Sequence, residues 1–131
     1  MAKVTIYTDG GYHPKYKTGS FAYIIEYPSG DIVKDFGEIS VENSQQAELY
    51  ALEMAIKMAD SNDLCIYTDY QPVIIAMNQA NCNPVFDKIK EIVKDKDVQW
   101  HWVHGHSEFN EVVECDKMCS SVFKKIKNMD I

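Results

Sequence analysis

Two aspartates in this chain, Asp9 and Asp69, end copies of the same tetrapeptide, Ile-Tyr-Thr-Asp. Each copy closes a short apolar run that is typical of a buried strand, and turn-forming residues follow each aspartate. Two such strands can lie side by side in one sheet, which would place Asp9 and Asp69 together at its edge. Two carboxylates at such a short distance repel each other, and a divalent metal ion bound between them usually offsets this repulsion. Because aspartate is common after strands, the repeat alone leaves coincidence open.

Two further acids are expected to point inward from helices. Glu48 is predicted in the first turn of a helix, on an apolar stripe that should face the sheet, and Asp116 lies on a similar face of the last helix. Either acid alone has an ordinary explanation, a helix-dipole partner for Glu48 and a boundary residue for Asp116. Convergence of four carboxylates from two strands and two helices indicates a metal site instead. The stripe residues are Leu52, Ala55 and Ala59 for Glu48, and Val112, Cys119, Ser120 and Phe123 for Asp116.

A histidine-rich segment lies between the last predicted strand and the last helix. Strand alternation places Trp100 and Trp102 on one face, Gly105 ends the strand, and His106 begins a loop toward Asp116. A loop histidine beside carboxylates can move protons near neutral pH. An exposed histidine without a role is the alternative.

These residues need a mixed α/β scaffold. The early hairpin favours antiparallel pairing, and the later helical crossovers favour parallel pairing with right-handed connections. We therefore expect a mixed five-stranded sheet, antiparallel in its first three strands and parallel in the rest, with helices on both faces. The expected strands are 3–9, 21–25, 32–39, 64–69 and 98–103; the expected helices are 43 or 44 to 60, 72–79, 84–94 and 112–127; the expected loop is 12–19 and the turn 27–31.

Length and composition fit one domain spanning 1–131, because 46% of the 131 residues are hydrophobic. No apolar run is long enough for a membrane span, and the first residues lack a signal-peptide pattern, so we expect a cytoplasmic protein with reduced thiols. The formal net charge of -7 argues against nucleic-acid binding by electrostatics alone. All 13 basic residues are lysines, so phosphate contacts would be made by ammonium, hydroxyl and backbone N–H groups.

The motifs together resemble the type 1 ribonuclease H family, over nearly the whole chain and in the same order. The family pattern has Asp-Gly after the first strand, Glu early in the first helix, Thr-Asp-Ser-Gln after the fourth strand, and Trp-Val-x-Gly-His before a final Asp. The matching residues are Asp9 and Gly10, Glu48, residues 68–71, residues 102–106, and Asp116.

The resemblance implies an RNase H-like fold and hydrolysis of the RNA strand of an RNA–DNA hybrid with two Mg²⁺ or Mn²⁺ ions. It implies that a monomer binds the hybrid and that no membrane is involved. The implied catalytic residues are Asp9, Glu48, Asp69 and Asp116 as metal ligands, with His106 assisting proton transfer or product release. The implied substrate-binding residues are Gly10, Gly11, Ser44, Gln45 and Gln71.

The chain departs from the family pattern at several positions. The first loop lacks the usual Asn-x-Gly, and Tyr70 replaces a serine after the third acid. Val112 and Val113 stand where Asn and Glu are usual, and an Asn-Glu pair occurs two residues earlier. The basic insertion of many members is absent, because residues 80–84 join two helices directly, as in the shorter archaeal, viral or reverse-transcriptase-linked members.

Three other interpretations are open from the sequence. The first is a non-catalytic, nucleic-acid-binding member of the fold, and the second is a nuclease of the same fold that acts on DNA. The third is a zinc module built from His104, His106, Cys115 and Cys119.

Overall fold

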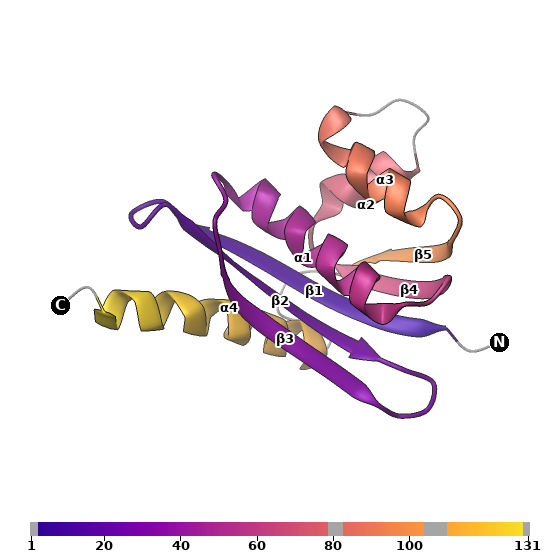
Figure 1. The fold of residues 1–131 in the computed structure, drawn as a ribbon, viewed down its shortest axis with the longest axis horizontal. Coiled ribbons are helices and arrows are strands. Elements are labelled where there is room, and N and C mark those ends of the chain that lie inside the picture. The colour runs from indigo at the N-terminus through magenta and orange to yellow at the C-terminus, as the bar shows by residue number, and fades with distance from the viewer. Residues whose placement is uncertain (1–2, 79–82, 104–109, 130–131) are drawn as a thin grey trace.

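A computed structural model describes residues 3–78, 83–103 and 110–129 and shows a five-stranded sheet flanked by helices (Figure 1). The order of elements is the one that the sequence predicts. The strands are β1 (Val4–His13), β2 (Thr18–Glu26), β3 (Ile32–Ile39), β4 (Asp63–Thr68) and β5 (Asp97–Trp102). The helices are α1 (Ser44–Ala59), α2 (Gln71–Met77), the 3-10 turn η1 (Pro84–Phe86), α3 (Asp87–Val93) and α4 (Asn110–Met129).

The sheet has the order β3-β2-β1-β4-β5, so β1 is its central strand. β2 pairs antiparallel with both β1 and β3, whereas β4 pairs parallel with both β1 and β5. The predicted mixed sheet is therefore confirmed. This topology places the C-terminal ends of β1 and β4 next to each other, where the two copies of the tetrapeptide end.

Two cores cover the two faces of the sheet. The larger one packs α1, α2 and α3 against one face, and buries Leu52 and Ala55 of the predicted α1 stripe completely. The smaller one packs α4 against the other face and includes Tyr7 and Val112. Ile6 belongs to the first core and Tyr7 to the second, as strand alternation requires. Side chains of α1 on one face of the sheet and of α4 on the other can thus both reach the end of β1.

The β1–β2 hairpin is longer than predicted. Residues 12–19 were expected to form a loop, because Pro14 and Gly19 are turn residues, but β1 continues to His13 and β2 begins at Thr18. Only residues 14–17 form the turn, and Lys17 adopts a positive φ of 48° there. Contacts with α4 explain the extra pairing, since the His13 ring lies 5.6 Å from the ring of Phe123.

The remaining boundaries differ from the predicted ones by a few residues. α4 begins at Asn110, two residues before its predicted start, and the third predicted helix begins as η1. Asn83 caps that turn, because its Oδ1 accepts from the backbone N–H of Val85 at 3.1 Å. None of the helices in the described residues is both long and apolar enough to cross a membrane.

Candidate functional site

The two copies of the tetrapeptide lie in register. Ile6 pairs with Ile66 and Tyr7 with Tyr67 across the parallel β1–β4 ladder. The two tyrosine rings stack with their centroids 5.2 Å apart. The strands therefore end together, and the predicted pairing of Asp9 with Asp69 at one edge is confirmed.

A buried threonine holds the turn that carries Asp69. Thr68 is 2% exposed, and its Oγ1 accepts from the backbone N–H of Tyr70 at 3.1 Å. Its carbonyl accepts from the backbone N–H of Val103 at 3.0 Å, which ties the turn to the end of β5. The hydroxyl and the carbonyl of Thr68 thus both fix the backbone next to Asp69.

Glu48 reaches the site because α1 lies directly against β1. A Cβ placed on Gly10 would lie 2.5 Å from the carbonyl carbon of Ala47 and 2.6 Å from the backbone nitrogen of Glu48. Only a glycine allows this approach of two backbones. The structure shows that Gly10 packs against α1, and its predicted role of letting the backbone approach the RNA stays a prediction.

The position of Glu48 within α1 differs from the prediction. Asn43 is the N-cap, and its Oδ1 accepts from the backbone N–H of Gln46 at 2.9 Å. The helix begins at Ser44 and has no acidic residue in its first turn, so Glu48 lies in the second turn. The predicted side of the helix is nonetheless correct, because Leu52, one turn later, is fully buried.

Three carboxylates meet at this edge of the sheet. One oxygen from each of Asp9, Glu48 and Asp69 lies within 4.8 Å of the other two. Carboxylate oxygens are the ligands that hard cations such as Mg²⁺ and Mn²⁺ prefer, and the spacing suits a shared ion. The donor set therefore fits a divalent metal site.

Burial and mutual repulsion make these acids unusually basic. Burial, followed by the charges of Asp69 and Asp116, raises the pKa of the Asp9 carboxyl to about 7. Burial also raises the pKa of Glu48 well above its usual value, followed by the charges of Asp9 and Asp69. The backbone N–H of Gly10 donates to both groups and offsets only part of this effect. Such a cluster is stabilised by cations.

The raised pKa values predict how the metal-free protein responds to pH. In the folded state Asp9 and Glu48 bind protons at pH values where the unfolded chain has released them, so stability should fall as pH rises from about 4 through 7. In EDTA the melting temperature is expected to be higher at pH 5.5 than at pH 8. Adding Mg²⁺ at pH 8 should restore it. A melting temperature in EDTA that increases toward pH 8 would contradict this assignment.

Asp116 approaches the group of three from α4. It lies outside the 4.8 Å cluster, yet its charge raises the pKa of Asp9. Two cysteines of α4, Cys115 and Cys119, contact β1 and so hold the helix that carries Asp116. The sequence did not predict this role of the cysteines. The Sγ of Cys115 donates to the carbonyl of Tyr7 at 3.7 Å, and that of Cys119 donates to the carbonyl of Asp9 at 3.5 Å. The signal was their spacing of four residues on a core-facing stripe.

The same contacts argue against the zinc interpretation. Burial raises the pKa of the Cys119 thiol to about 12 and also raises that of Cys115, whereas zinc requires thiolates. Both sulfur atoms face β1 rather than a common ligand site. His104 and His106 lie outside the described residues.

The predicted substrate-binding residues border the acidic cluster. Ser44 and Gln45 begin α1, and Gln71 begins α2, where its N–H donates to the carbonyl of Asp69 at 3.1 Å. The side chain of Gln45 also forms a hydrogen bond with the hydroxyl of Tyr70. Gly11 packs against α4, since a Cβ there would lie 3.0 Å from the ring of Phe123. Contact of these residues with nucleic acid stays a prediction.

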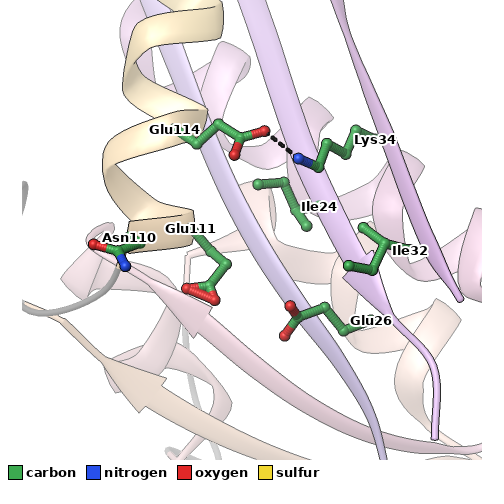
Figure 2. A pocket seen from close by; sticks show the side chains of 7 residues that line it. All are labelled: Ile24, Glu26, Ile32, Lys34, Asn110, Glu111 and Glu114. Carbon is green, nitrogen blue, oxygen red and sulfur yellow. Dashed lines mark ion pairs between the residues drawn. The ribbon is translucent and has the colours of Figure 1, made fainter. Parts of the chain in front are cut away.

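A pocket of about 230 Å³ lies elsewhere, between β2, β3 and the start of α4 (Figure 2). Lys34 and Glu114 form an ion pair of 2.6 Å in it, and Asn110 and Glu111 also line it. None of the four candidate metal ligands contributes to its wall. The Asn-Glu pair that precedes Asp116 at an unusual spacing thus lines this pocket, while Val112 fills the core.

Comparison with known proteins decides the family, because the model of the family described as RNase H matches residues 1–124. The chain belongs to the RNase H family. Members of this family are metal-dependent ribonucleases that hydrolyse the RNA strand of RNA–DNA hybrids, and the acidic cluster agrees with that chemistry.

Individual relatives are bacterial, viral and archaeal. The chain is 30% identical to a ribonuclease H of Ruthia magnifica subsp. Calyptogena magnifica, with 82% of this chain and 86% of the relative covered. It is 28% identical to a ribonuclease H of Campylobacter concisus, with 98% and 97% covered. It is also 33% identical to part of the Pol polyprotein of caprine arthritis encephalitis virus, over 91% of this chain but 11% of the polyprotein.

A solved structure shows the same fold. RNase H1 from the halophilic archaeon Halobacterium salinarum superimposes with a TM-score of 0.71 over 95% of this chain and 99% of its own. Its sequence identity is 18%, so this likeness supports the fold and not the individual site residues.

Proposed function

We propose that this family member hydrolyses the RNA strand of RNA–DNA hybrids with two Mg²⁺ or Mn²⁺ ions held by Asp9, Glu48, Asp69 and Asp116. The observation that carries the proposal is the approach of three carboxylate oxygens from β1, α1 and β4 to within 4.8 Å. Two bound hard cations would activate the attacking water and stabilise the leaving oxygen.

The protein residues have distinct tasks in this proposal. The backbone N–H of Gly10 offsets part of the raised pKa of Asp9 and Glu48, and the missing side chain of Gly10 lets α1 approach β1. Thr68 fixes the backbone beside Asp69, and the thiol of Cys119 ties α4 to the carbonyl of Asp9. Asp9 and Asp69 are thereby held by rigid elements before any ligand binds, which limits reorganisation during the reaction.

Selection of RNA requires contacts with the 2′-hydroxyl group. Ser44, Gln45 and Gln71 lie at the starts of two helices that flank the acidic cluster. Hydroxyl and amide side chains can both donate to and accept from a 2′-hydroxyl. These three residues are therefore proposed to read the RNA strand next to the cleaved bond.

One assay tests the function. Labelled RNA–DNA hybrid, double-stranded DNA, double-stranded RNA and single-stranded RNA are incubated with the protein in Mg²⁺, Mn²⁺ or EDTA. Cleavage of the RNA strand of the hybrid in a divalent metal, and none in EDTA, is the expected result. Full activity in EDTA, no activity in any divalent metal, or cleavage of duplex DNA in place of the hybrid would exclude the proposal.

His106 is proposed to assist proton transfer or product release, and His106→Ala should slow turnover by roughly 10- to 100-fold. Metal affinity should change little, because imidazole is a poor ligand for Mg²⁺. The measurements are kcat with saturating hybrid and the Mg²⁺ concentration that gives half-maximal activity. His104→Ala is the matched control, and if it proves the more damaging change, the assignment of His106 is wrong.

A further inference from the structure

In the part of the chain that the structure describes, most of the lysines without an ion pair lie at one end of the molecule. The chain has 13 lysines. Those on the sheet, on α1 and around α3 are engaged with other groups: Lys3, Lys34, Lys57, Lys88, Lys90, Lys94 and Lys96. Within the described part of the chain, the rest form no ion pair, and all of them belong to the β1–β2 turn or to α4: Lys15, Lys17, Lys117, Lys124, Lys125 and Lys127.

The turn and the helix are parts of one surface because β1 and α4 run side by side. The thiols of Cys115 and Cys119 contact β1 at Tyr7 and Asp9, so two strand residues, about 6.6 Å, match one helical turn of about 6 Å. The next step of this register places Phe123 at Gly11, where an added Cβ would lie 3.0 Å from its ring, and the same ring reaches the ring of His13 at 5.6 Å. Figure 1 shows the β1–β2 turn and the C-terminal half of α4 at the same end of the molecule.

Ring contacts hold the β1–β2 turn against the helix. The Nζ of Lys15 lies 5.3 Å from the centre of the Tyr16 ring, and that ring lies 4.8 Å from the ring of His13. His13 in turn packs on Phe123. Lys124 follows Phe123 directly and Lys127 lies one helical turn beyond it. Lys15 and Lys17 therefore share an exposed surface with Lys124 and Lys127, which we call the lysine surface.

The lysine surface lies farther along β1 and α4 than the acidic cluster, on the same two elements. His13, beside the turn, lies four strand residues beyond Asp9, or about 13 Å, and Lys124 lies eight helix residues beyond Asp116, or about 12 Å. Nucleic-acid duplexes rise about 3.4 Å for each base pair. A duplex whose phosphodiester bond lies at the acids would reach the lysine surface roughly four base pairs away.

We propose that the lysine surface binds the phosphate backbone of the RNA–DNA hybrid about four base pairs from the cleaved bond. The inference depends on the proposed function, since it takes the hybrid as the bound polymer. It explains how a chain with a net charge of -7 and no arginine holds a polyanion. The acid on β3 near this end, Glu38, accepts from the hydroxyl of Thr18 at 2.9 Å and lines a separate hollow with Phe36 and Lys125. Lys125 is therefore left out of the surface.

The test uses two double variants, Lys15→Gln with Lys17→Gln and Lys124→Gln with Lys127→Gln. The control is Lys34→Gln with Lys57→Gln, whose lysines pair with Glu114 and Glu53 outside the lysine surface. All three proteins carry the same formal net charge of -9, two less than the -7 of the parent chain. The readouts are kcat and KM for hybrid cleavage at salt concentrations from 0.1 to 1 M. Binding of hybrid by anisotropy is measured in Mg²⁺ with Asp69→Asn added to each protein.

Each surface double variant should raise KM and the dissociation constant by roughly 10- to 60-fold at 0.1 M salt and leave kcat unchanged. Each lost phosphate contact lowers the slope of log affinity against log salt by about 0.9, so two lost contacts weaken binding by up to about 60-fold between 1 M and 0.1 M salt. The difference from the parent should therefore vanish near 1 M salt. The corresponding Lys→Arg double variants keep the charge and should retain parental KM. The control should also match the parent.

Other outcomes separate the two proposals. If the parent chain cleaves hybrid and both surface variants behave like the control, the lysine surface does not bind the hybrid. A fall in kcat with unchanged KM would also overturn it, because the lysines would then act on the acidic site. If the parent chain does not cleave hybrid but the surface variants still weaken binding with a reduced salt slope, the proposed function fails and the lysine surface remains a nucleic-acid contact.

Discussion

Asp9→Asn is expected to abolish hybrid cleavage while leaving the metal-free fold at least as stable as the parent. The carboxylate is one of three that meet within 4.8 Å, and losing one ligand removes several kcal/mol of transition-state stabilisation, or about three powers of ten in rate. In the absence of metal the same carboxylate is buried and is repelled by Asp69 and Asp116, and these effects together raise its pKa to about 7. An amide of equal size removes that repulsion.

The pH dependence of this effect identifies its cause. At pH 5.5 Asp9 already carries a proton, so the substitution should change the melting temperature in EDTA very little. At pH 8 Asp9 of the parent chain is mostly ionised, so the variant should melt at a higher temperature than the parent. Calorimetric or circular-dichroism melts at both pH values, together with initial rates in Mg²⁺, measure the two parts of the prediction.

Two further variants complete the comparison. Asp69→Asn should also remove activity without lowering stability, because the Thr68 hydrogen bonds that hold its turn are left intact. Asp95→Asn changes an exposed acid outside the cluster and should leave both activity and melting temperature unchanged. A large drop in melting temperature for both Asp9→Asn and Asp69→Asn would show that these aspartates serve the fold.

The sequence predicts the scaffold well because its strongest signals are local and periodic. The repeated tetrapeptide predicts that β1 and β4 end together, and the ladder confirms this with Tyr7 opposite Tyr67. The apolar stripe of α1 likewise predicts which side of the helix faces the sheet, and therefore where Glu48 points. Alternation along β1 and helical periodicity along α1 are properties of neighbouring residues and need no knowledge of the partner element.

Features that depend on distant residues are the ones that sequence reasoning missed. The hairpin continues to His13 because Phe123, more than a hundred residues later, packs on it. The contact of Cys119 with the carbonyl of Asp9 joins two elements with no shared local pattern. The turn of α1 that holds Glu48 differs for a local reason, because either Asn43 or Ser44 can cap the helix and capping by Asn43 places Glu48 in the second turn.

Gly10 is the clearest of these distant effects, and Gly10→Ala is expected to lower both activity and stability strongly. The added Cβ would lie 2.5 to 2.6 Å from three backbone atoms of Ala47 and Glu48. Backbone atoms cannot rotate away as a side chain does, so α1 must move off β1. Overpacking of this kind costs typically 1–3 kcal/mol. Because the moving segment carries Glu48, the three acids should separate as well.

Gly37→Ala is the matched control for this substitution. Its Cβ would meet the Phe21 ring at 3.2 Å, an edge contact that a small side-chain shift relieves, and Gly37 lies on the edge strand β3. The control should keep parental activity and nearly parental stability. Gly10→Ala, assayed well below its melting temperature, should need a much higher Mg²⁺ concentration for half-maximal activity and should cleave hybrid at least about 100-fold more slowly, since a misplacement of 1 Å has that effect. If it instead retains parental metal dependence, the contact between α1 and β1 at Gly10 does not set the geometry of the acidic cluster.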